Sequence, residues 1–450
     1  MGITIIGLGP GDPYLMTCEA RELLEKAEEV YLRTKHHPAV DSLPHHLQLH
    51  SFDHLYEEVE TFEEIYERIA QEILRLGERP EGILYAVPGH PLVGEASVHR
   101  ILALAQERGV LVRIVVGMSF LEPVFSLLKV DPLSGLQIGD AVTLASRSHP
   151  GLNPDTPALI GQLYSRTVAS GLKLTLMNLY PDDHLVILLQ GAGTRKVKIR
   201  TLPLHELDHE KGIDHLTSLF IPPLSAPSSF STLQDIVARL RAPDGCPWDR
   251  EQTPQSLRPF LLEETYEALE ALDLEDTERL REELGDLLLE VLLQVQIAAE
   301  GGEFKMPDVL RGIITKLIRR HPHVFGDSEI TTSGEVVSQW QEIKREEGQL
   351  AEGPFADLPL TMPALARAQR IEQVAPARGL TAARDEAELL ARVKKGLEEV
   401  SKLAGEEAEE AWGRLLFDLV ALANLKGIDA ESALRKAVRE LERRLGSPQT

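Results

Sequence analysis

The sequence has only two cysteines, Cys18 and Cys246, among its 450 residues. Two thiols cannot supply a disulfide framework or a four-cysteine zinc site, and such usage is typical of a reducing compartment. No window offers the roughly 18 consecutive apolar residues that a membrane span needs. The first residues also lack a basic leader followed by a long apolar stretch. We therefore expect a cytoplasmic protein with no membrane partner.

Positive charge is scarce, with 47 Lys and Arg against 71 Asp and Glu and a net charge of -24. Such a chain repels the phosphates of nucleic acids, so we expect no nucleic-acid partner. A hydrophobic content of 43% argues against disorder. At about 150 residues per domain, the length predicts roughly three compact units.

The hydrophobic periodicity changes near Pro222. Before it, short apolar runs alternate with amphipathic stretches, which is typical of α/β layers. The expected strands are 3–6, 83–87, 112–116, 141–145, 173–177 and 185–189, and the expected helices are 18–30, 62–76 and 96–108. After it, apolar residues recur at spacings of three and four, which predicts packed helices over 261–272, 278–299 and 307–320.

The helical half carries a faint internal repeat, because residues 281–288 are echoed by residues 409–416. Small and proline residues at 222–229 are typical of a linker. We therefore expect an α/β domain over 1–221, a linker over 222–229, and two all-helical copies over 230–352 and 353–450.

Carboxylates gather on two consecutive predicted helices. Glu263, Glu264 and Glu267 lie on the first, and Glu283 and Asp286 lie on the next. Offsets of three and four place such side chains on one helix face. Oxygens from two helices can converge on Mg²⁺, which keeps positions open for water and phosphate. The alternative is a solvated acidic surface on a metal-free interaction scaffold.

Lys316, Arg319 and Arg320 end a later predicted helix. Such cations either complement the negative end of the helix dipole or bind phosphate oxygens. Together with the carboxylates, they are consistent with a metal-bound phosphate ester as substrate.

Five ordered motifs then show a resemblance to the MazG family of nucleoside triphosphate pyrophosphohydrolases. They occupy residues 243–249, 261–267, 282–286, 319–326 and 340–344. The resemblance implies hydrolysis of a nucleoside triphosphate to the monophosphate and pyrophosphate, and a homodimer. It implies Mg²⁺, with Mn²⁺ as an alternative, bound by Glu264, Glu267, Glu283 and Asp286. Glu263 would support these ligands or act as general base, and Lys316, Arg319 and Arg320 would bind phosphate.

The second helical copy departs from this pattern. Glu398 and Glu399 match the first pair, but Lys402 replaces the third glutamate, and Ala411 and Arg414 stand opposite Glu283 and Asp286. Because cationic side chains repel a metal ion, we expect this copy to be degenerate and to serve packing or dimerisation.

Three turns in the first half follow apolar runs, at residues 7–13, 88–91 and 117–119. Ligands in open α/β sheets bind at the carboxyl ends of strands, so these turns could surround one pocket or be purely structural. They resemble the tetrapyrrole methylase superfamily, whose members bind S-adenosylmethionine between two α/β subdomains. The residues matched to cofactor binding are Gly9, Pro10, Gly11, Asp12, Gly89, His90, Pro91 and Ser119.

His90 stands where porphyrinogen methylases carry an aspartate, so the methyl acceptor expected here is a tetrapyrrole or another molecule. A non-catalytic ligand-sensing module is the alternative for this half. The whole chain resembles the bacterial YabN-type fusion. The expected fold is a two-subdomain α/β methylase-like half followed by a duplicated all-α MazG-like half.

Overall fold

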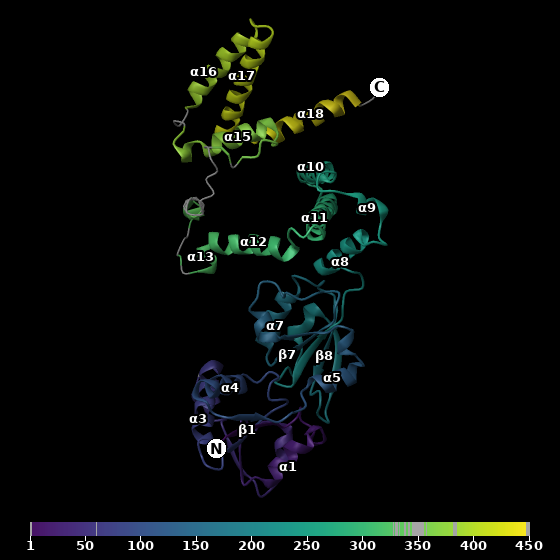
Figure 1. Ribbon diagram of the computed structural model, residues 1–450, viewed down its shortest axis with the longest axis vertical. Helices are drawn as coiled ribbons and strands as arrows, with labels where there is room; N and C mark the ends of the chain where they lie inside the picture. Colours follow the sequence, from purple (N-terminus) through teal and green to yellow (C-terminus); the bar gives the residue numbers. More distant parts are fainter. Residues whose placement is uncertain are drawn as a thin grey trace. The chain divides into compact units, whose positions relative to one another are not determined.

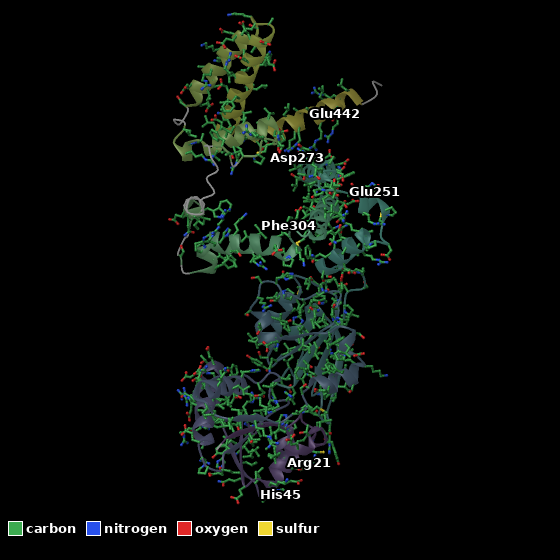
Figure 2. All side chains as sticks on the ribbon, in the orientation of Figure 1. Arg21, His45, Glu251, Asp273, Phe304 and Glu442 are labelled. Atoms are coloured by element: carbon green, nitrogen blue, oxygen red, sulfur yellow. The ribbon has the colours of Figure 1, made fainter. Side chains whose placement is uncertain are left out.

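A computed structural model describes residues 2–446, except 60, 327, 329–331, 333, 337–338, 341–342, 344–354, 357 and 381–384. The chain divides into two compact units, Met1–Gly301 and Gly302–Thr450, and each is described by itself (Figure 1). Figure 2 shows their side chains, with Asp273 near the end of α10 and Phe304 just before α12.

The first sheet is entirely parallel and has the strand order β3-β2-β4-β1-β5. Its strands are β1 (Ile3–Gly7), β2 (Glu29–Leu32), β3 (Gln48–Ser51), β4 (Ile83–Val87) and β5 (Val112–Ile114). Parallel strands need crossover connections, which here include α1 (Cys18–Lys26), α2 (Leu55–Glu58), α3 (Phe62–Gly77) and α4 (Ala96–Arg108).

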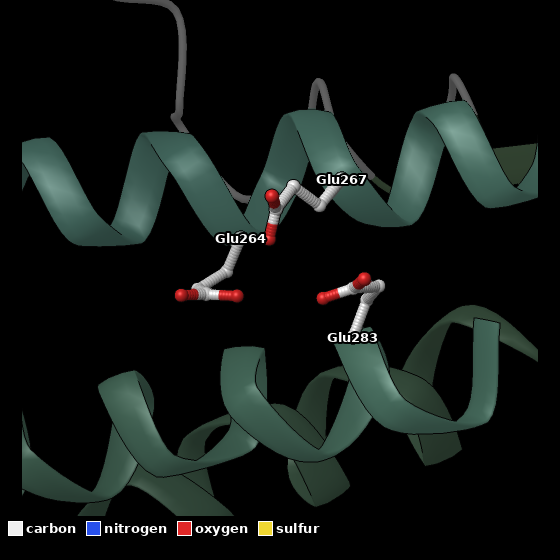
Figure 3. A group of neighbouring side chains, drawn as sticks. All are labelled: Glu264, Glu267 and Glu283. Atoms are coloured by element: carbon white, nitrogen blue, oxygen red, sulfur yellow. The ribbon is translucent and has the colours of Figure 1, made fainter. Parts of the chain in front are cut away.

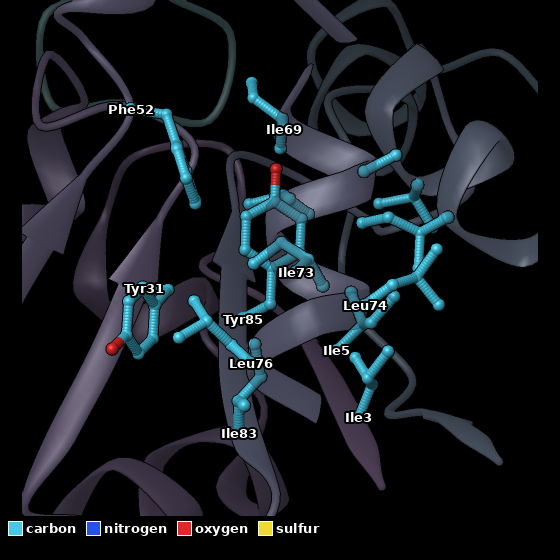
Figure 4. Close-up of a cluster of buried hydrophobic side chains, with 14 of the residues drawn as sticks. Ile3, Ile5, Tyr31, Phe52, Ile69, Ile73, Leu74, Leu76, Ile83 and Tyr85 are labelled. Carbon is cyan, nitrogen blue, oxygen red and sulfur yellow. The ribbon is translucent and has the colours of Figure 1, made fainter. Parts of the chain in front are cut away.

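Successive side chains of β1 enter different cores, because a strand alternates its faces. Ile3 and Ile5 pack with side chains of α3 and α4 in the cluster of Figure 4, whereas Ile6 packs with side chains of α1. Both faces of the sheet are thereby covered, and in open α/β sheets of this kind ligands bind at the carboxyl ends of the strands.

The second sheet has the order β6-β7-β10-β8-β9 and is mixed, with only β6 and β7 parallel. Its strands are β6 (Gln137–Asp140), β7 (Ala158–Gly161), β8 (Leu185–Gln190), β9 (Lys198–Pro203) and β10 (Thr217–Ile221). The accompanying helices are α5 (Leu121–Leu128), α6 (Ala141–Ala145) and α7 (Arg166–Leu176). Two sheets in this half confirm the predicted two-subdomain α/β architecture.

Two expected strands are wrong. Residues 141–145 form helix α6, because the Asp140 carboxylate accepts a hydrogen bond from the Thr143 backbone N–H at 2.8 Å and caps the helix. Residues 173–177 lie at the end of α7. Their alternating pattern suggested a strand, but the buried residues Leu172 and Leu176 are one helical turn apart, and Leu174 is exposed.

The expected helix over 18–30 is too long. It ends at Lys26, and residues from Glu29 form β2. The sequence analysis missed this strand, together with β3, β6, β7, β9 and β10. Several of them are only four residues long, which is too short for a clear period of two.

The remainder of the described chain has no strand and is helical, as predicted. The first unit ends with α8 (Phe230–Arg241), α9 (Pro247–Glu251), α10 (Arg258–Leu274) and α11 (Thr277–Glu300). The second contains α12 (Met306–Arg320), α13 (Pro322–Phe325), α15 (Ala364–Val374), α16 (Glu386–Val400), α17 (Glu406–Leu425) and α18 (Ala430–Gly446). Within the described ranges, no helix combines the length and apolarity needed to cross a bilayer.

Asp155 ties the second sheet to the start of α8. Its carboxylate accepts hydrogen bonds from the backbone N–H groups of Ser228, at 2.7 Å, and Ser229, at 3.1 Å, and from the Thr232 hydroxyl. These hydrogen bonds, led by that of Thr232, lower the pKa of Asp155 from 3.8 to about 2. The end of the predicted linker is therefore anchored by side-chain contacts.

We expect Asp155→Ala to lower the midpoint of thermal unfolding and to increase proteolytic cleavage between residues 222 and 229. Folding depresses the pKa of Asp155. Its stabilising effect is therefore fully present above pH 3.8 and is lost as the pH falls toward about 2. The difference in midpoint from the wild type should shrink below about pH 4. Asp235→Ala, at an exposed position of α8, is the matched control. Equal cleavage of both variants would contradict this role of Asp155.

Candidate functional site

Helices α10 and α11 form a hairpin that presents the predicted carboxylates. Glu275 ends α10 in the left-handed conformation with φ of 56°. Asp276 then caps α11, its carboxylate accepting a hydrogen bond from the Arg279 backbone N–H at 3.1 Å. This two-residue connection fixes the register in which the two helices face each other.

Three carboxylates converge across the hairpin. Glu264 and Glu267 project from α10 toward Glu283 of α11 (Figure 3), and one oxygen of each lies within 4.8 Å of the others. Glu283 is buried, whereas the other two are half-buried. The structure thus brings together three of the four predicted metal ligands.

Like charges dominate this group. Burial raises the pKa of Glu264, and the charges of Asp286, Glu267, Glu283 and Glu263 raise it further. Asp286, the fourth predicted ligand, is therefore an electrostatic neighbour of Glu264, although it is exposed. The pKa of Glu267 is raised chiefly by the charge of Glu283. The carboxylates carry more negative charge than the neighbouring basic side chains neutralise. This excess of negative charge favours a bound cation.

One basic side chain reduces this charge at the edge of the group. Arg279 Nε lies 3.2 Å from Glu283 Oε1, and Arg279 Nη1 lies 2.7 Å from Glu270 Oε2. Glu263, which sequence analysis assigned as a supporting residue or base, is exposed next to Glu264. It remains accessible to water.

The apolar residues around the carboxylates are only partly enclosed. Leu269 is half-buried, but Tyr266, Leu284 and Leu288 are exposed. The buried apolar residues of the hairpin are instead Ala268, Ala271, Leu292, Leu293, Val295 and Ala298. The carboxylates therefore border an open apolar face.

The predicted phosphate-binding residues lie on α12, in the second unit. Lys316 and Arg319 line a hollow along this helix together with Asp308 and Arg311. Arg320 is buried, with its guanidinium 5.7 Å from the ring centre of Trp340. The last matched motif, 340–344, includes Lys344, which lies outside the described residues.

The three glycine-containing turns of the first half lie against one another. Gly9 and Gly89 form an antiparallel bridge, with the Gly89 backbone N–H donating to the Gly9 carbonyl at 2.9 Å. A Cβ at Gly7 would overlap the Gly89 carbonyl oxygen, so glycine is required there. A Cβ at Gly117 would lie 3.1 Å from Pro91. The turns therefore gather at the carboxyl ends of β1, β4 and β5.

Several polar residues predicted to bind the cofactor also have local partners. Asp12 accepts a hydrogen bond from the Tyr14 backbone N–H at 3.1 Å, and His90 Nδ1 accepts one from that of Leu92 at 3.0 Å. The buried Ser119 hydroxyl donates to Glu122 Oε2 at 2.7 Å. These contacts hold the turns in shape.

Sequence analysis missed a buried ion pair beside these turns. Arg33 directly follows β2, and its Nε lies 3.4 Å from Oε2 of Glu95, which precedes α4. Burial raises the pKa of Glu95 to about 7, against the effect of Arg33. Burial and the charge of Arg33 also lower the pKa of nearby His37 to about 4. Because the helix over 18–30 was extended into β2, Arg33 was not recognised as a strand-end residue.

Two family models match the chain. The tetrapyrrole (corrin/porphyrin) methylases match residues 2–208, and the MazG nucleotide pyrophosphohydrolase domain matches residues 252–325.

Similar proteins cover one or both of these regions. YabN of Bacillus subtilis (strain 168) is 42% identical over 377 residues, covering 82% of this chain and 76% of that protein. The nucleoside triphosphate pyrophosphohydrolase/pyrophosphatase MazG of Thermotoga maritima is 42% identical over 217 residues, covering 48% of this chain and 83% of that protein.

Among solved structures, uroporphyrin-III-C-methyltransferase from Thermus thermophilus aligns with a TM-score of 0.37 and 19% identity, covering 49% of this chain and 91% of that one. The domain matches and the extended similarity to YabN lead to one assignment. The chain belongs to the YabN-type family, in which a tetrapyrrole methylase domain is followed by a MazG domain.

Proposed function

We propose that the α10–α11 hairpin hydrolyses nucleoside triphosphates between the α- and β-phosphates, releasing the monophosphate and pyrophosphate. The observation that carries this proposal is the convergence of Glu264, Glu267 and Glu283 within 4.8 Å. The similarity to the Thermotoga maritima pyrophosphohydrolase supports the same reaction.

The donor set fits a hard divalent cation. It consists of carboxylate oxygens without sulfur or imidazole, which suits Mg²⁺ or Mn²⁺. Glu264, Glu267 and Glu283 would hold the ion, and Asp286 would complete the set. When bound, the cation supplies positive charge to phosphate oxygens and lowers the pKa of a bound water.

Other side chains of the helical half would take the remaining roles. Glu263 is exposed beside Glu264 and accepts the proton of the attacking water. Lys316 and Arg319 bind phosphate oxygens and stabilise the charge that develops on them. Arg320, buried against Trp340, holds this end of α12 in place and assists them.

For the first half we propose S-adenosylmethionine binding at the three contacting turns. Gly9, Pro10, Gly11 and Asp12 form one wall, Gly89, His90 and Pro91 form the second, and Ser119 belongs to the third. The close backbone approach of Gly9 and Gly89 supports this proposal, as does the methylase family match. The acceptor, a tetrapyrrole or another molecule, would meet the Arg33–Glu95 pair.

We further propose that the chain forms a homodimer through its helical half. Exposed apolar side chains follow α12, and others flank the carboxylate hairpin. Contiguous apolar surface of this kind marks an interaction site, and helical hairpins commonly complete a bundle with a second copy. The α12 residues are Val309, Leu310, Ile313, Ile314, Leu317 and Ile318.

The first test uses Glu264→Gln and Asp286→Asn in the full chain with Mg²⁺ and a panel of nucleoside triphosphates. Removing a ligand should lower pyrophosphate release by about 100-fold or more. Pyrophosphate and orthophosphate are quantified separately. Glu278→Gln is the matched control, because this side chain lies on the same helix and is 77% exposed. A folded wild type that releases no pyrophosphate would favour the metal-free scaffold.

The second test measures the repulsion among the carboxylates without metal. The pKa values of Glu264 and Glu267 are raised in the folded chain, so their effect on stability becomes more unfavourable as the pH rises from about 4.5. Metal-free Glu264→Gln should therefore melt at a higher temperature than the wild type at pH 7, and the two should converge near pH 4. Mg²⁺ should raise the wild-type midpoint more than that of the variant. Identical midpoints under all conditions would show that the carboxylates do not interact strongly.

The third test addresses the first half by titrating S-adenosylhomocysteine calorimetrically. His90→Ala should weaken binding by about tenfold, or about 1.4 kcal/mol, because His90 shapes one of the turns. His149→Ala is the matched control, since its Nδ1 similarly accepts a hydrogen bond, at 3.2 Å, from the backbone N–H two residues later. Equal weakening in both variants would place the ligand elsewhere.

A further inference from the structure

The two helical copies share a pattern of burial. Helices α11 and α17 can be aligned by a shift of 128 residues, taken from the repeat between 281–288 and 409–416. Under this shift, four buried residues of α11 meet four buried residues of α17: Glu283 and Ala411, Glu290 and Asp418, Leu292 and Val420, and Leu293 and Ala421. Glu290 and Asp418 are therefore acids at equivalent buried positions.

In the second copy, this acid has a cationic partner. Asp418 is 6% exposed, and its Oδ1 lies 2.6 Å from Nη2 of Arg392 on α16. A buried carboxylate is costly unless a positive charge faces it, and Arg392 supplies that charge. The copy that has lost its metal ligands thus neutralises the buried acid with its own side chain.

In the first copy, the equivalent acid has no such partner. Glu290 is 7% exposed, its Oε2 has no hydrogen-bond partner, and no Lys or Arg of the described chain pairs with it. When Glu263 and Glu264 are aligned with Glu398 and Glu399, the residue opposite Arg392 is the buried Leu257. The first copy therefore has no arginine at the position from which Arg392 faces Asp418 in the second copy.

Glu290 also belongs to the same helix face as the predicted ligands. It follows Glu283 by seven residues, about two helical turns, and Asp286 by four, about one turn. Glu283 and Glu290 are the buried carboxylates of α11. Glu290 is also close enough to Glu264 for the two charges to interact. Its charge therefore acts on the carboxylate group from the same helix.

We propose that Glu290 is a fifth metal-binding carboxylate, which extends the group of Glu264, Glu267 and Glu283 to a second divalent cation. That cation does for Glu290 what Arg392 does for Asp418. The inference rests on the proposed function for the identity of the ions, but metal binding can be measured without turnover.

The test counts Mn²⁺ ions bound per full-length chain by electron paramagnetic resonance. Glu290→Gln, which keeps the shape and removes the charge, should bind one Mn²⁺ fewer than the wild type. It should also show a smaller rise in melting temperature with Mn²⁺. Glu290→Asp should bind as many Mn²⁺ ions as the wild type, but one of them at least tenfold more weakly. Glu278→Gln should match the wild type.

The opposite results are equally clear. If Glu290→Gln binds as many ions as the wild type, with affinities within twofold, then Glu290 is a buried protonated acid and the inference is wrong, even if pyrophosphate release stands. If Glu290→Gln binds one ion fewer than the wild type, but the wild type releases no pyrophosphate, the metal site stands and the proposed reaction fails. A wild type that binds no Mn²⁺ overturns the inference. Should Glu290→Gln unfold, Glu290→Asp alone decides through its Mn²⁺ titration.

Discussion

Repulsion between like charges on one helical hairpin is the constraint on which the helical half depends. Glu264, Glu267 and Glu283 are held within 4.8 Å because Glu275 and Asp276 permit only a tight connection between α10 and α11. Arg279 offsets part of this charge at one edge. The rest raises the pKa values of Glu264 and Glu267. A fold that keeps such a group gains stability when a divalent cation binds it.

The second copy has a similar helical arrangement but, within its described residues, lacks the group of converging carboxylates. Ala411 replaces the buried Glu283, and Arg414 lies 3.5 Å from Glu410 rather than beside a cation. Its remaining buried acid, Asp418, is paired with Arg392. The two copies therefore differ in their buried acids: Asp418 faces Arg392, whereas Glu290 has an oxygen without a hydrogen-bond partner in the described chain. This difference is consistent with a division between a reactive copy and a structural one.

The first half depends on a different constraint, the close approach of backbone segments at the carboxyl ends of its parallel strands. Gly7, Gly9 and Gly89 allow this approach, because a side chain at Gly7 would overlap a carbonyl oxygen. The same edge carries the buried Arg33–Glu95 pair. The Glu95 carboxylate of this pair is buried and Arg33 is half-buried, and such a pair is costly unless further polar contacts satisfy it. The pair lies beside the glycine-containing turns, at the carboxyl ends of the strands, where open α/β sheets bind small ligands.

The sequence by itself determined the α/β and all-α halves and the helices that carry the carboxylates. These follow from local periodicity, and residues 83–87 and 96–108 have the predicted bounds. It also predicted Glu264, Glu267 and Glu283 as candidate ligands, because the spacing of acids within each helix is local, whereas their convergence between α10 and α11 is tertiary. The short strands, the helix at 141–145, the Arg33–Glu95 pair and the unpaired Glu290 required the tertiary structure. Strand pairing, burial and the partner of a charge depend on residues far apart in the chain, and no local pattern specifies them.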